Sequence, residues 1–388
     1  MSVLAWLAAG GLLAWAYLLF FRRGFWRARE RLRGTTPPAH WPDVVALIPA
    51  RNEAESIAEA VASIRVQDYP GRLRVVVIDD ASEDGTAERA RQAGAEVLAA
   101  PPLAPGWTGK LWALAHGAER TAADGPEFYW LSDADIVHPP HLLARLVAKA
   151  ENENRDLVSL MVRLCCESFW EKRLVPAFVF FFQMLYPFAA VNDPKSPVAG
   201  AAGGCVLLRR TALERAGGLR AIRGAVIDDC TLAARIKGTG GRLWLGLAEE
   251  SRSLRGHREL APLLAMIRRS AFAQLRYSGA LLVATLLAMG VIFLASPVAT
   301  VAGLALGDAA AATLGGLGWI AMAAAYRPTL VYYLRPAGEA ILLPLVAILY
   351  AHATLVSAID HWRRRGSRWK GRSYGPTGAR LDRLPEDG

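Results

Sequence analysis

The sequence predicts an α/β domain with a mostly parallel sheet, joined to an N-terminal membrane anchor and to C-terminal transmembrane helices. Three observations predict this class. Residues 42–256 alternate between short apolar runs and helix-like segments, which is typical of a parallel α/β sheet. Residues 3–21 are uncharged and long enough to span a bilayer. Further apolar segments follow between residues 279 and 360.

These patterns divide the chain into five parts. The parts are a transmembrane anchor at 1–22, the α/β domain at 42–257, an amphipathic interface helix at 258–278, membrane segments at 279–360 and a basic cytoplasmic tail at 361–388.

The anchor is followed by basic residues, whereas a signal peptide carries them before its apolar run. The formal net charge of +10 is concentrated in two clusters, at 22–33 and at 363–372, and both directly follow apolar segments. This placement indicates contact with lipid headgroups rather than with nucleic acid, and it places the α/β domain on the cytoplasmic side. The four cysteines have no paired spacing, so we expect reduced core residues.

Within the α/β domain, apolar runs predict strands at 44–50, 73–79, 96–100 and 128–132. Asn52, with Glu55 three residues later, predicts a capping box at the start of the first helix. A second helix is expected from Thr86 to Gln92, before Gly94.

Acidic residues follow the ends of these strands. They are Glu53, Asp79, Asp80, Asp133 and Asp135, and a further pair, Asp228 and Asp229, precedes a helical stretch. Asp133 and Asp135 would point to the same side of a strand, where two carboxylates repel each other unless a cation or hydrogen-bond donors lie between them. Mg²⁺ and Mn²⁺ take oxygen ligands and are commonly shared between carboxylates and a substrate phosphate. An acidic pair alone can also be a helix cap or a solvated turn.

The C-terminal part leaves its membrane topology open. Residues 174–191 contain two prolines and a Gln, which favours a surface element over a span. Residues 259–278 have apolar positions at helical spacing, with arginines elsewhere around the helix. Residues 280–325 predict two spans that turn near Gly307, and residues 340–358 are one more apolar segment. Three full spans after a cytoplasmic domain would place the basic tail outside, so one segment is expected to be re-entrant or interfacial. Pro344 makes 340–358 the first candidate.

Several segments resemble glycosyltransferase family 2, over about residues 42–277. They are IPARNE (48–53), VVVIDDASEDGTA (75–87), GKLWALAHG (109–117), SDAD (132–135), GGCVLLRRTALERAGGL (203–219), DDCTLAAR (228–235) and QLRY (274–277). SDAD matches the family's D-x-D metal motif, and DDCTLAAR resembles the motif that carries the catalytic base, with Asp228 where Glu is usual. QLRY is one residue shorter than the Q-x-x-R-W gate of membrane-bound members and has Tyr for Trp.

The resemblance implies a GT-A-type fold and transfer of a sugar from a nucleotide sugar, UDP-sugar foremost, with inversion of configuration. It implies Asp229 as the base, and Asp133 and Asp135 as ligands of Mg²⁺ or Mn²⁺. Because Asp229 precedes a helix, a plain helix cap is the alternative for this residue. The positions expected to contact the substrate are Ala50, Asn52, Glu53, Asp80, Lys110, Asp133, Gln274, Arg276 and Tyr277.

Longer strings, at 101–117, 271–278 and 368–374, resemble the hopene-associated group within this family. That likeness implies a hopanoid acceptor and a bacterial inner membrane. Another isoprenoid, a sphingolipid-like lipid or a polysaccharide stays open as the acceptor. A processive polysaccharide synthase would need more spans than the three segments that follow the domain. A non-catalytic membrane scaffold is the alternative of another class, and the intact Asp80, Asp133, Asp135 and Asp229 argue against it.

Overall fold

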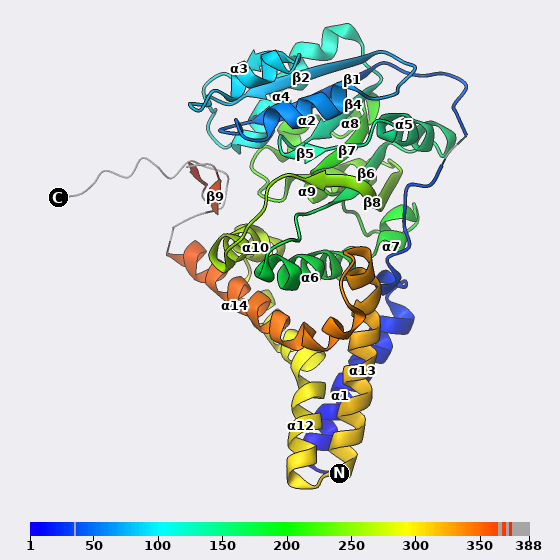
Figure 1. Ribbon diagram of the computed structural model, residues 1–388, viewed down its shortest axis with the longest axis vertical. Helices are drawn as coiled ribbons and strands as arrows, with labels where there is room; N and C mark the ends of the chain where they lie inside the picture. The colour runs from blue at the N-terminus through cyan, green and yellow to red at the C-terminus, as the bar shows by residue number, and fades with distance from the viewer. Residues whose placement is uncertain (35, 364–366, 370–371, 375–388) are drawn as a thin grey trace, which may run out of the picture. The chain divides into compact units, whose positions relative to one another are not determined.

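Figure 1 shows a computed structural model of the chain, which describes residues 1–34, 36–363, 367–369 and 372–374. The chain forms two compact units, an α/β unit and a helical unit. The helical unit comprises Met1–Ala28, Cys166–Ala189 and His257–Arg364, and the α/β unit comprises Arg29–Cys165, Ala190–Gly256 and Arg365–Gly388.

The α/β unit contains an eight-stranded sheet in the order β3-β2-β1-β4-β7-β6-β8-β5. Its strands are β1 (Val44–Ala50), β2 (Leu73–Asp79), β3 (Glu96–Ala99), β4 (Phe128–Ser132), β5 (Ile136–Val137), β6 (Leu157–Arg163), β7 (Cys205–Arg209) and β8 (Leu243–Ser253). Strands β1 to β4 pair in parallel, as do β6 and β8. Strand β7 runs antiparallel to β4 and β6, and β5 runs antiparallel to β8. The predicted α/β fold with a mostly parallel sheet is therefore confirmed.

Strands such as β1 could be predicted from the sequence because they are buried and therefore apolar along their whole length. All seven residues of β1 are buried, because helices cover both faces of a parallel sheet. The helices and short 3-10 turns of this unit are α2 (Ile57–Arg65), α3 (Thr86–Gln92), α4 (Gly109–Thr121), η2 (Ala122–Asp124), α5 (Leu142–Asn152), α8 (Arg210–Arg215), η3 (Leu219–Ile222) and α9 (Asp228–Gly238). Helix α7 (Phe188–Asn192) carries the chain from the helical unit into the α/β unit.

The helical unit is built from long apolar helices. They are α1 (Val3–Phe21), η1 (Phe25–Arg27), α6 (Phe169–Leu185), α10 (Leu260–Gln274), α11 (Gly279–Met289), the π-helical η4 (Gly290–Ala295), α12 (Ser296–Leu306), α13 (Ala309–Tyr332), η5 (Ala337–Leu342) and α14 (Leu343–Trp362). Helices α1, α12 and α13 run side by side as a bundle (Figure 1). Small residues allow this close packing, since a Cβ at Gly315 would lie 2.7 Å from the Ser296 carbonyl oxygen.

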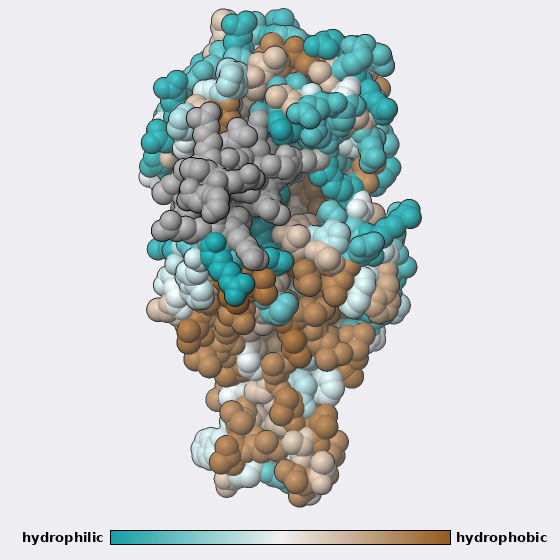
Figure 2. Space-filling model, turned by 90° about the vertical axis from the view of Figure 1, so that its left-hand side faces the viewer, coloured by the Kyte–Doolittle hydropathy of each residue, from teal (hydrophilic) through white to brown (hydrophobic). Residues whose placement is uncertain are grey.

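Four stretches are long and apolar enough to cross a membrane, by length and composition: Val3–Phe21, Gly279–Leu306, Ala309–Tyr332 and Ala337–Trp362. Many of their large apolar side chains are exposed, among them Trp6, Phe20, Leu304 and Ile320. Figure 2 shows the resulting hydrophobic surface of the helical unit in brown. Such a surface is unusual for a protein in water and indicates association with a membrane.

One sequence expectation about the helical unit is confirmed. Residues 280–325 form two helical stretches that turn at Gly307, which has a φ of +71°. Helix α6 carries a capping box between Ser168 and Glu171, and the membrane-surface position expected for residues 174–191 stays a prediction. Pro344 lies in the first turn of α14, where no helical hydrogen bond is lost, so it does not interrupt the helix. The interfacial or re-entrant position expected for residues 340–358 stays a prediction.

The first helix of the α/β unit begins later than predicted. Helix α2 starts at Ile57 and its N-cap is Ser56, so Asn52 and Glu55 form no capping box. The cysteine prediction holds in part: all four are reduced, Cys205 and Cys230 are buried, and Cys165 and Cys166 are half-buried. In the predicted basic tail, Arg364, Arg365 and Lys370 lie outside the described residues.

Candidate active site

The loops that follow β1 and β2 are tied to each other by hydrogen bonds. The Asn52 side-chain oxygen accepts a hydrogen bond from the Glu83 backbone N–H at 3.0 Å, and the Glu53 N–H donates to the Thr86 hydroxyl at 2.8 Å. Asn52 adopts a φ of +50°, a conformation that asparagine tolerates better than most residues. Asn52 therefore shapes this loop rather than capping a helix.

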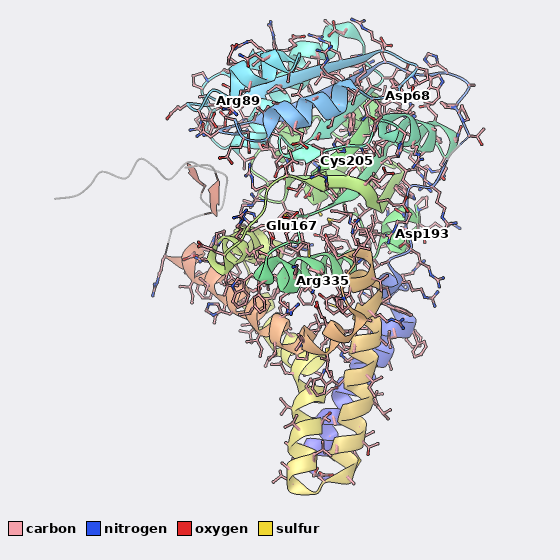
Figure 3. The ribbon with its side chains drawn as sticks, in the orientation of Figure 1. Asp68, Arg89, Glu167, Asp193, Cys205 and Arg335 are labelled. Carbon is pink, nitrogen blue, oxygen red and sulfur yellow. The ribbon has the colours of Figure 1, made fainter. Side chains whose placement is uncertain are left out.

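Asp80 lies deep in the same region. Its side chain is buried, and its backbone N–H donates to the Ala50 carbonyl oxygen at 2.8 Å. Arg89, labelled in Figure 3, donates from α3 to the Ala54 carbonyl oxygen at 2.9 Å. The ends of β1 and β2 thus place Ala50, Asn52, Glu53 and Asp80 together, as expected for a ligand site at the carboxyl ends of parallel strands.

The Asp133–Asp135 pair lies in a turn, not on a strand. Strand β4 ends at Ser132, and the Ile136 N–H donates to the Asp133 carbonyl oxygen at 3.3 Å. The prediction that strand geometry places the two carboxylates on the same side is therefore wrong. Burial raises the pKa of Asp133 and the charge of Asp135 adds to this shift, so the two carboxylates still interact.

Lys110, in the first turn of α4, lies between two carboxylates. Its ammonium group is 2.7 Å from the Asp133 Oδ1 and 3.6 Å from the Asp228 Oδ2. Burial alone would lower the pKa of Lys110, but the charges of Asp133 and Asp228 raise it above its usual value. Burial raises the pKa of Asp133, and Lys110 opposes that shift. Lys110 therefore stays charged and offsets part of the acidic cluster.

Arg255 is a second cation in the site, and sequence reasoning missed it. Its guanidinium group forms an ion pair with Glu53, and its Nε lies 3.6 Å from the Asp135 Oδ2. Ser253, at the end of β8, donates to the same Asp135 oxygen at 3.1 Å. Arg255 follows β8, which pairs with β5 beside the acidic turn. Without the order of the strands in the sheet, the sequence could not show that Arg255 lies near Asp135.

Asp229 is held by two backbone groups. The Gly203 N–H donates to its Oδ2 at 2.8 Å, and the Cys230 N–H donates to its Oδ1 at 2.7 Å. Burial and the charge of Asp228 raise the pKa of Asp229 to about 6, although Lys110 and the two backbone hydrogen bonds oppose the shift. A carboxyl group with a pKa close to neutral is suited to accept a proton at physiological pH.

Gly203 sits between Lys110 and Asp229. A Cβ at this position would lie 3.1 Å from the Lys110 Nζ and 3.4 Å from the Asp229 Oδ2. A small pocket opens beside these groups. Its lining includes the apolar side chains of Leu111, Leu114, Leu131, Leu219, Ile222 and Leu232. The apolar walls account for the raised pKa of Asp229, because they offer no solvation to the charged carboxylate.

A buried hydrogen-bond network lies behind the acidic turn. The His138 ring lies 3.0 Å from the Ser132 hydroxyl and 3.0 Å from the Ser251 hydroxyl, so it links β4 to β8. Burial lowers the pKa of His138 to about 3, and the ring is therefore neutral. His138 is therefore a buried structural link between the two strands.

The remaining predicted contacts belong to the helical unit. Gln274 is the last residue of α10 and accepts a hydrogen bond from the Tyr186 hydroxyl at 2.9 Å. Arg276 and Tyr277 follow with φ angles of +52° and +56°. The Tyr277 ring stacks on His361, with centroids 4.5 Å apart. Their role in binding the substrate stays a prediction.

The donor set suits a hard cation that is shared with a substrate. Asp133 and Asp135 offer carboxylate oxygens, and the part of the chain that the structure describes contains no group of three or more His, Cys, Asp or Glu able to enclose an ion. Mg²⁺ and Mn²⁺ sites of this kind are completed by phosphate oxygens and water. The residues present therefore fit the predicted metal.

Comparison with known proteins agrees with this geometry. The sequence profile of glycosyl transferase family 2 matches residues 45–217. Residues 45–217 are therefore similar to glycosyltransferase family 2. The matched segment includes Ala50, Asp80, Lys110, Asp133 and Asp135, whereas Asp228 and Asp229 lie beyond it.

Two curated relatives match part of the chain. The 4,4'-diaponeurosporenoate glycosyltransferase of Staphylococcus haemolyticus is 32% identical over 148 residues, which cover 37% of this chain and 37% of the relative. An N-acetylglucosaminyltransferase of Mesorhizobium japonicum is 32% identical over 120 residues, which cover 29% of this chain and 27% of the relative. The chain thus spans little more than a third of the length of the first relative and little more than a quarter of the second.

A solved structure matches nearly the whole chain. The mannosyltransferase PcManGT from Pyrobaculum calidifontis, determined in complex with GDP-Man and Mn²⁺, has a TM-score of 0.52 and 22% sequence identity. The match covers 92% of this chain and 99% of PcManGT. The match shows that the fold of the α/β unit is GT-A-like, and long apolar helices precede and follow this unit in the sequence.

Proposed function

We propose that the chain is a membrane-bound inverting glycosyltransferase, which moves a sugar from a nucleotide sugar to a hydroxyl group of a lipid. The observation that carries this proposal is the position of Asp229. Its carboxylate is held by two backbone N–H groups and has a pKa raised to about 6. Lys110 connects the surroundings of Asp229 with the Asp133–Asp135 turn.

In this reaction Asp229 acts as the general base. It accepts the proton of the acceptor hydroxyl while that oxygen attacks the anomeric carbon of the sugar. The new bond joins the acceptor oxygen to the anomeric carbon, and the bond to the diphosphate breaks on the opposite side. The nucleoside diphosphate leaves without protonation, so one base is sufficient and the configuration inverts. Glycoside hydrolases differ, because their leaving group requires an acid as well.

The donor is expected at the carboxyl ends of β1 and β2. Ala50, Asn52, Glu53 and Asp80 would contact the nucleotide, and UDP is the nucleotide implied by the family resemblance. Asp133 and Asp135 would hold Mg²⁺ or Mn²⁺, which offsets the negative charge of the diphosphate when bound. Lys110 adds a fixed positive charge beside Asp133. Gln274, Arg276 and Tyr277 stay candidates for contact with the diphosphate.

The proposed acceptor is an isoprenoid-derived lipid, with a hopanoid first. Its support is the hopene-associated likeness of residues 101–117 and 271–278, together with the exposed apolar helices. The staphylococcal relative carries the name of a carotenoid acid as its substrate, which makes a carotenoid the second candidate. We place the enzyme in a bacterial inner membrane with the α/β unit facing the cytoplasm, because the basic cluster at 22–33 follows α1.

Lipidomics of a deletion strain tests this proposal. The strain should lose one glycolipid class, and the wild-type gene should restore it. The Asp229→Asn variant, expressed at the same level, should not restore it. An unchanged set of glycolipids after deletion would contradict the proposed function, and the mass of the lost lipid would distinguish a hopanoid acceptor from a carotenoid acceptor.

A further inference from the structure

Helix α14 differs from the other three candidate spans in what it packs against. Helices α1, α12 and α13 pack on one another, whereas α14 packs mainly on α10 and runs obliquely to that bundle (Figure 1). Helix α10 carries Arg268 and Arg269 and is not among the candidate spans. A helix with these charges is suited to a membrane interface rather than to the hydrocarbon core.

The C-terminal end of α14 is fixed to α10 by polar contacts. Asp360 forms an ion pair with Arg268. The Ser357 hydroxyl donates to the Arg268 carbonyl oxygen at 2.6 Å and accepts from the Phe272 N–H at 3.1 Å. This end of α14 therefore lies at the level of α10.

The N-terminal end of α14 is fixed to α6 and to the end of α13. Glu339, in η5, lies 2.9 Å from the guanidinium group of Arg173 on α6 and also pairs with Arg335, which follows α13 and is labelled in Figure 3. Within α14, the Tyr350 hydroxyl donates to the Leu174 carbonyl oxygen of α6 at 2.8 Å. An ionic cluster thus accompanies this end as well.

Chain connectivity places both ends of α14 at the same end of the bundle. Ser2 hydrogen bonds to Asp308, so α1 and α13 begin side by side, and α13 runs from there to Arg335 at the opposite end. Helix α12 ends at the Asp308 turn, so the long α11–α12 stretch begins at the opposite end of the bundle, where Arg335 lies. Helix α10 directly precedes α11 in the sequence and therefore lies at this Arg335 end as well. The α10 contact and the Arg335 contact of α14 therefore lie at one end of the bundle. A helix that crossed the bilayer would have its ends at opposite faces.

The exposed surface of η5 and α14 is a stripe that is apolar except for His352. Its apolar members, Ile341, Leu345, Ile348, Leu355 and Trp362, are between 39% and 62% exposed and recur at spacings of three, four or seven residues. The opposite face is buried against the rest of the unit through Val346, Ala347, Tyr350, Ala353 and Ala358. A largely apolar exposed face, with a titratable histidine near its middle, is the pattern of a helix that lies in the interface rather than in the hydrocarbon core.

We propose that α14 lies in the plane of the membrane interface, with this stripe facing the acyl chains, and that only α1, α11–α12 and α13 cross the bilayer. The proposal rests on the membrane association proposed above and does not depend on the transferase chemistry. It also places the segment after α14 on the same side as the start of α10, which removes the conflict between three C-terminal spans and a basic cytoplasmic tail.

The depth of three stripe positions in the bilayer tests the proposal. Ile341→Cys, Ile348→Cys and Leu355→Cys are labelled one at a time with a fluorophore, in the full-length chain with Cys165 and Cys166 replaced by Ser. The protein is then reconstituted into phosphatidylcholine vesicles with bromine at different acyl positions. Successive labels are seven residues apart, or about 10 Å along a helix.

An interfacial α14 gives the same shallow depth at all three positions. A crossing helix instead places Ile348 near the bilayer centre, with the other two labels about 10 Å shallower, and that result would overturn the proposal. Ile320→Cys, in the middle of α13 and 68% exposed, is the matched control and should be quenched from the bilayer centre. Absence of quenching at every stripe position would also overturn it, because the stripe would then not contact lipid. Transferase activity of each variant is measured separately, so a failed depth pattern and a failed function are distinguished.

Discussion

At the scale of single residues, the site places a cation between the two carboxylates of two pairs. Lys110 lies between Asp133 and Asp228, and Arg255 lies between Glu53 and Asp135. The charge of Lys110 also acts on Asp229, but the Asp229 carboxylate is held by the N–H groups of Gly203 and Cys230. This difference separates a carboxylate suited to proton transfer from those suited to bind charge.

The Asp229→Asn variant should keep nucleotide binding and lose turnover. Asparagine retains the size of the side chain and one acceptor oxygen but cannot take a proton. Removal of a positioned general base costs about 10²–10⁴-fold in rate, so kcat should fall by this factor. The affinity for UDP, measured by calorimetry, should change little, because the proposed donor contacts lie on other residues.

Asp228→Asn is the matched control, because the two residues are adjacent and only Asp229 is proposed as the base. It should reduce kcat much less than Asp229→Asn does. If Asp228→Asn were inactive while Asp229→Asn turned over normally, the base would be assigned to the wrong neighbour.

The raised pKa of Asp229 predicts the pH dependence of the reaction. A base must be ionised, so kcat should be constant above about pH 6 and fall about tenfold per unit below it. The raised pKa also predicts that ionisation of Asp229, which the reaction requires, lowers the stability of the folded protein. Because the folded-state pKa lies above the unfolded value, the contribution of this group to stability is fully present below about pH 4 and is lost as the pH rises through about 6.

Thermal unfolding of the same variant tests the stability effect. Asp229→Asn should melt at a higher temperature than the wild type at pH 7.5 and show no such gain near pH 4. A melting difference that does not change with pH would contradict the raised pKa.

Arg255 predicts a competition for the metal site. Its guanidinium group is close to the Asp135 carboxylate that would bind the metal, so Arg255→Gln should strengthen the binding of Mn²⁺ alone. The gain should be about fivefold, equivalent to roughly 1 kcal/mol for an ion pair at a partly exposed site. Calorimetric titration with MnCl₂ in the absence of nucleotide measures it. Arg252→Gln, which removes a surface partner of Glu59, is the control and should leave the affinity for Mn²⁺ unchanged. Equal affinities for Mn²⁺ in both variants would argue against competition between Arg255 and the metal.

At the scale of elements, the sequence predicted the strands better than the loops. Strands at 44–50, 73–79 and 128–132 were predicted with the observed bounds, because buried strands are continuous apolar runs. The capping box at Asn52 failed because this side chain bonds to Glu83, thirty-one residues away. The strand geometry assigned to Asp133 and Asp135 failed because β4 ends one residue earlier. Neither the contact between Asn52 and Glu83 nor the end of β4 can be predicted from the neighbouring sequence. Arg255 was missed for the same reason, because its partners Glu53 and Asp135 are distant in the sequence.

Helix packing in the bundle depends on the absence of a side chain at Gly315. A Cβ at this position would lie 2.7 Å from the Ser296 carbonyl oxygen, whereas a Cβ at Gly316 would meet nothing within 4 Å. Gly315→Val should therefore destabilise the unit by about 1–3 kcal/mol, as overpacking does. Gly316→Val controls for the change in helix propensity. Melting of the purified chain in detergent should show a lower midpoint for the first variant only, and equal midpoints would mean that the helices separate without cost.

At the scale of the whole molecule, the two ends of the bundle in the helical unit differ in charge. One end contains Ser2 and the Asp308 turn, and residues 1–21 and 296–326 carry no Lys or Arg. The opposite end contains Arg22 and Arg23 after α1, and Arg335 after α13. Basic residues are retained on the cytoplasmic side of a membrane. The Arg335 end should therefore face the cytoplasm, where nucleotide sugars are available.

Labelling of single cysteines in intact spheroplasts tests this orientation. Ala309→Cys, exposed beside the Asp308 turn, should react with a membrane-impermeant maleimide added from outside. Ala337→Cys and Ser373→Cys should react only after the membrane is opened, because the first lies at the basic end and the second in the tail that α14 keeps on that side. Reaction of Ala337→Cys from outside would invert the molecule. Reaction of Ser373→Cys alone from outside would instead mean that α14 crosses the membrane, since only a crossing helix separates these two positions.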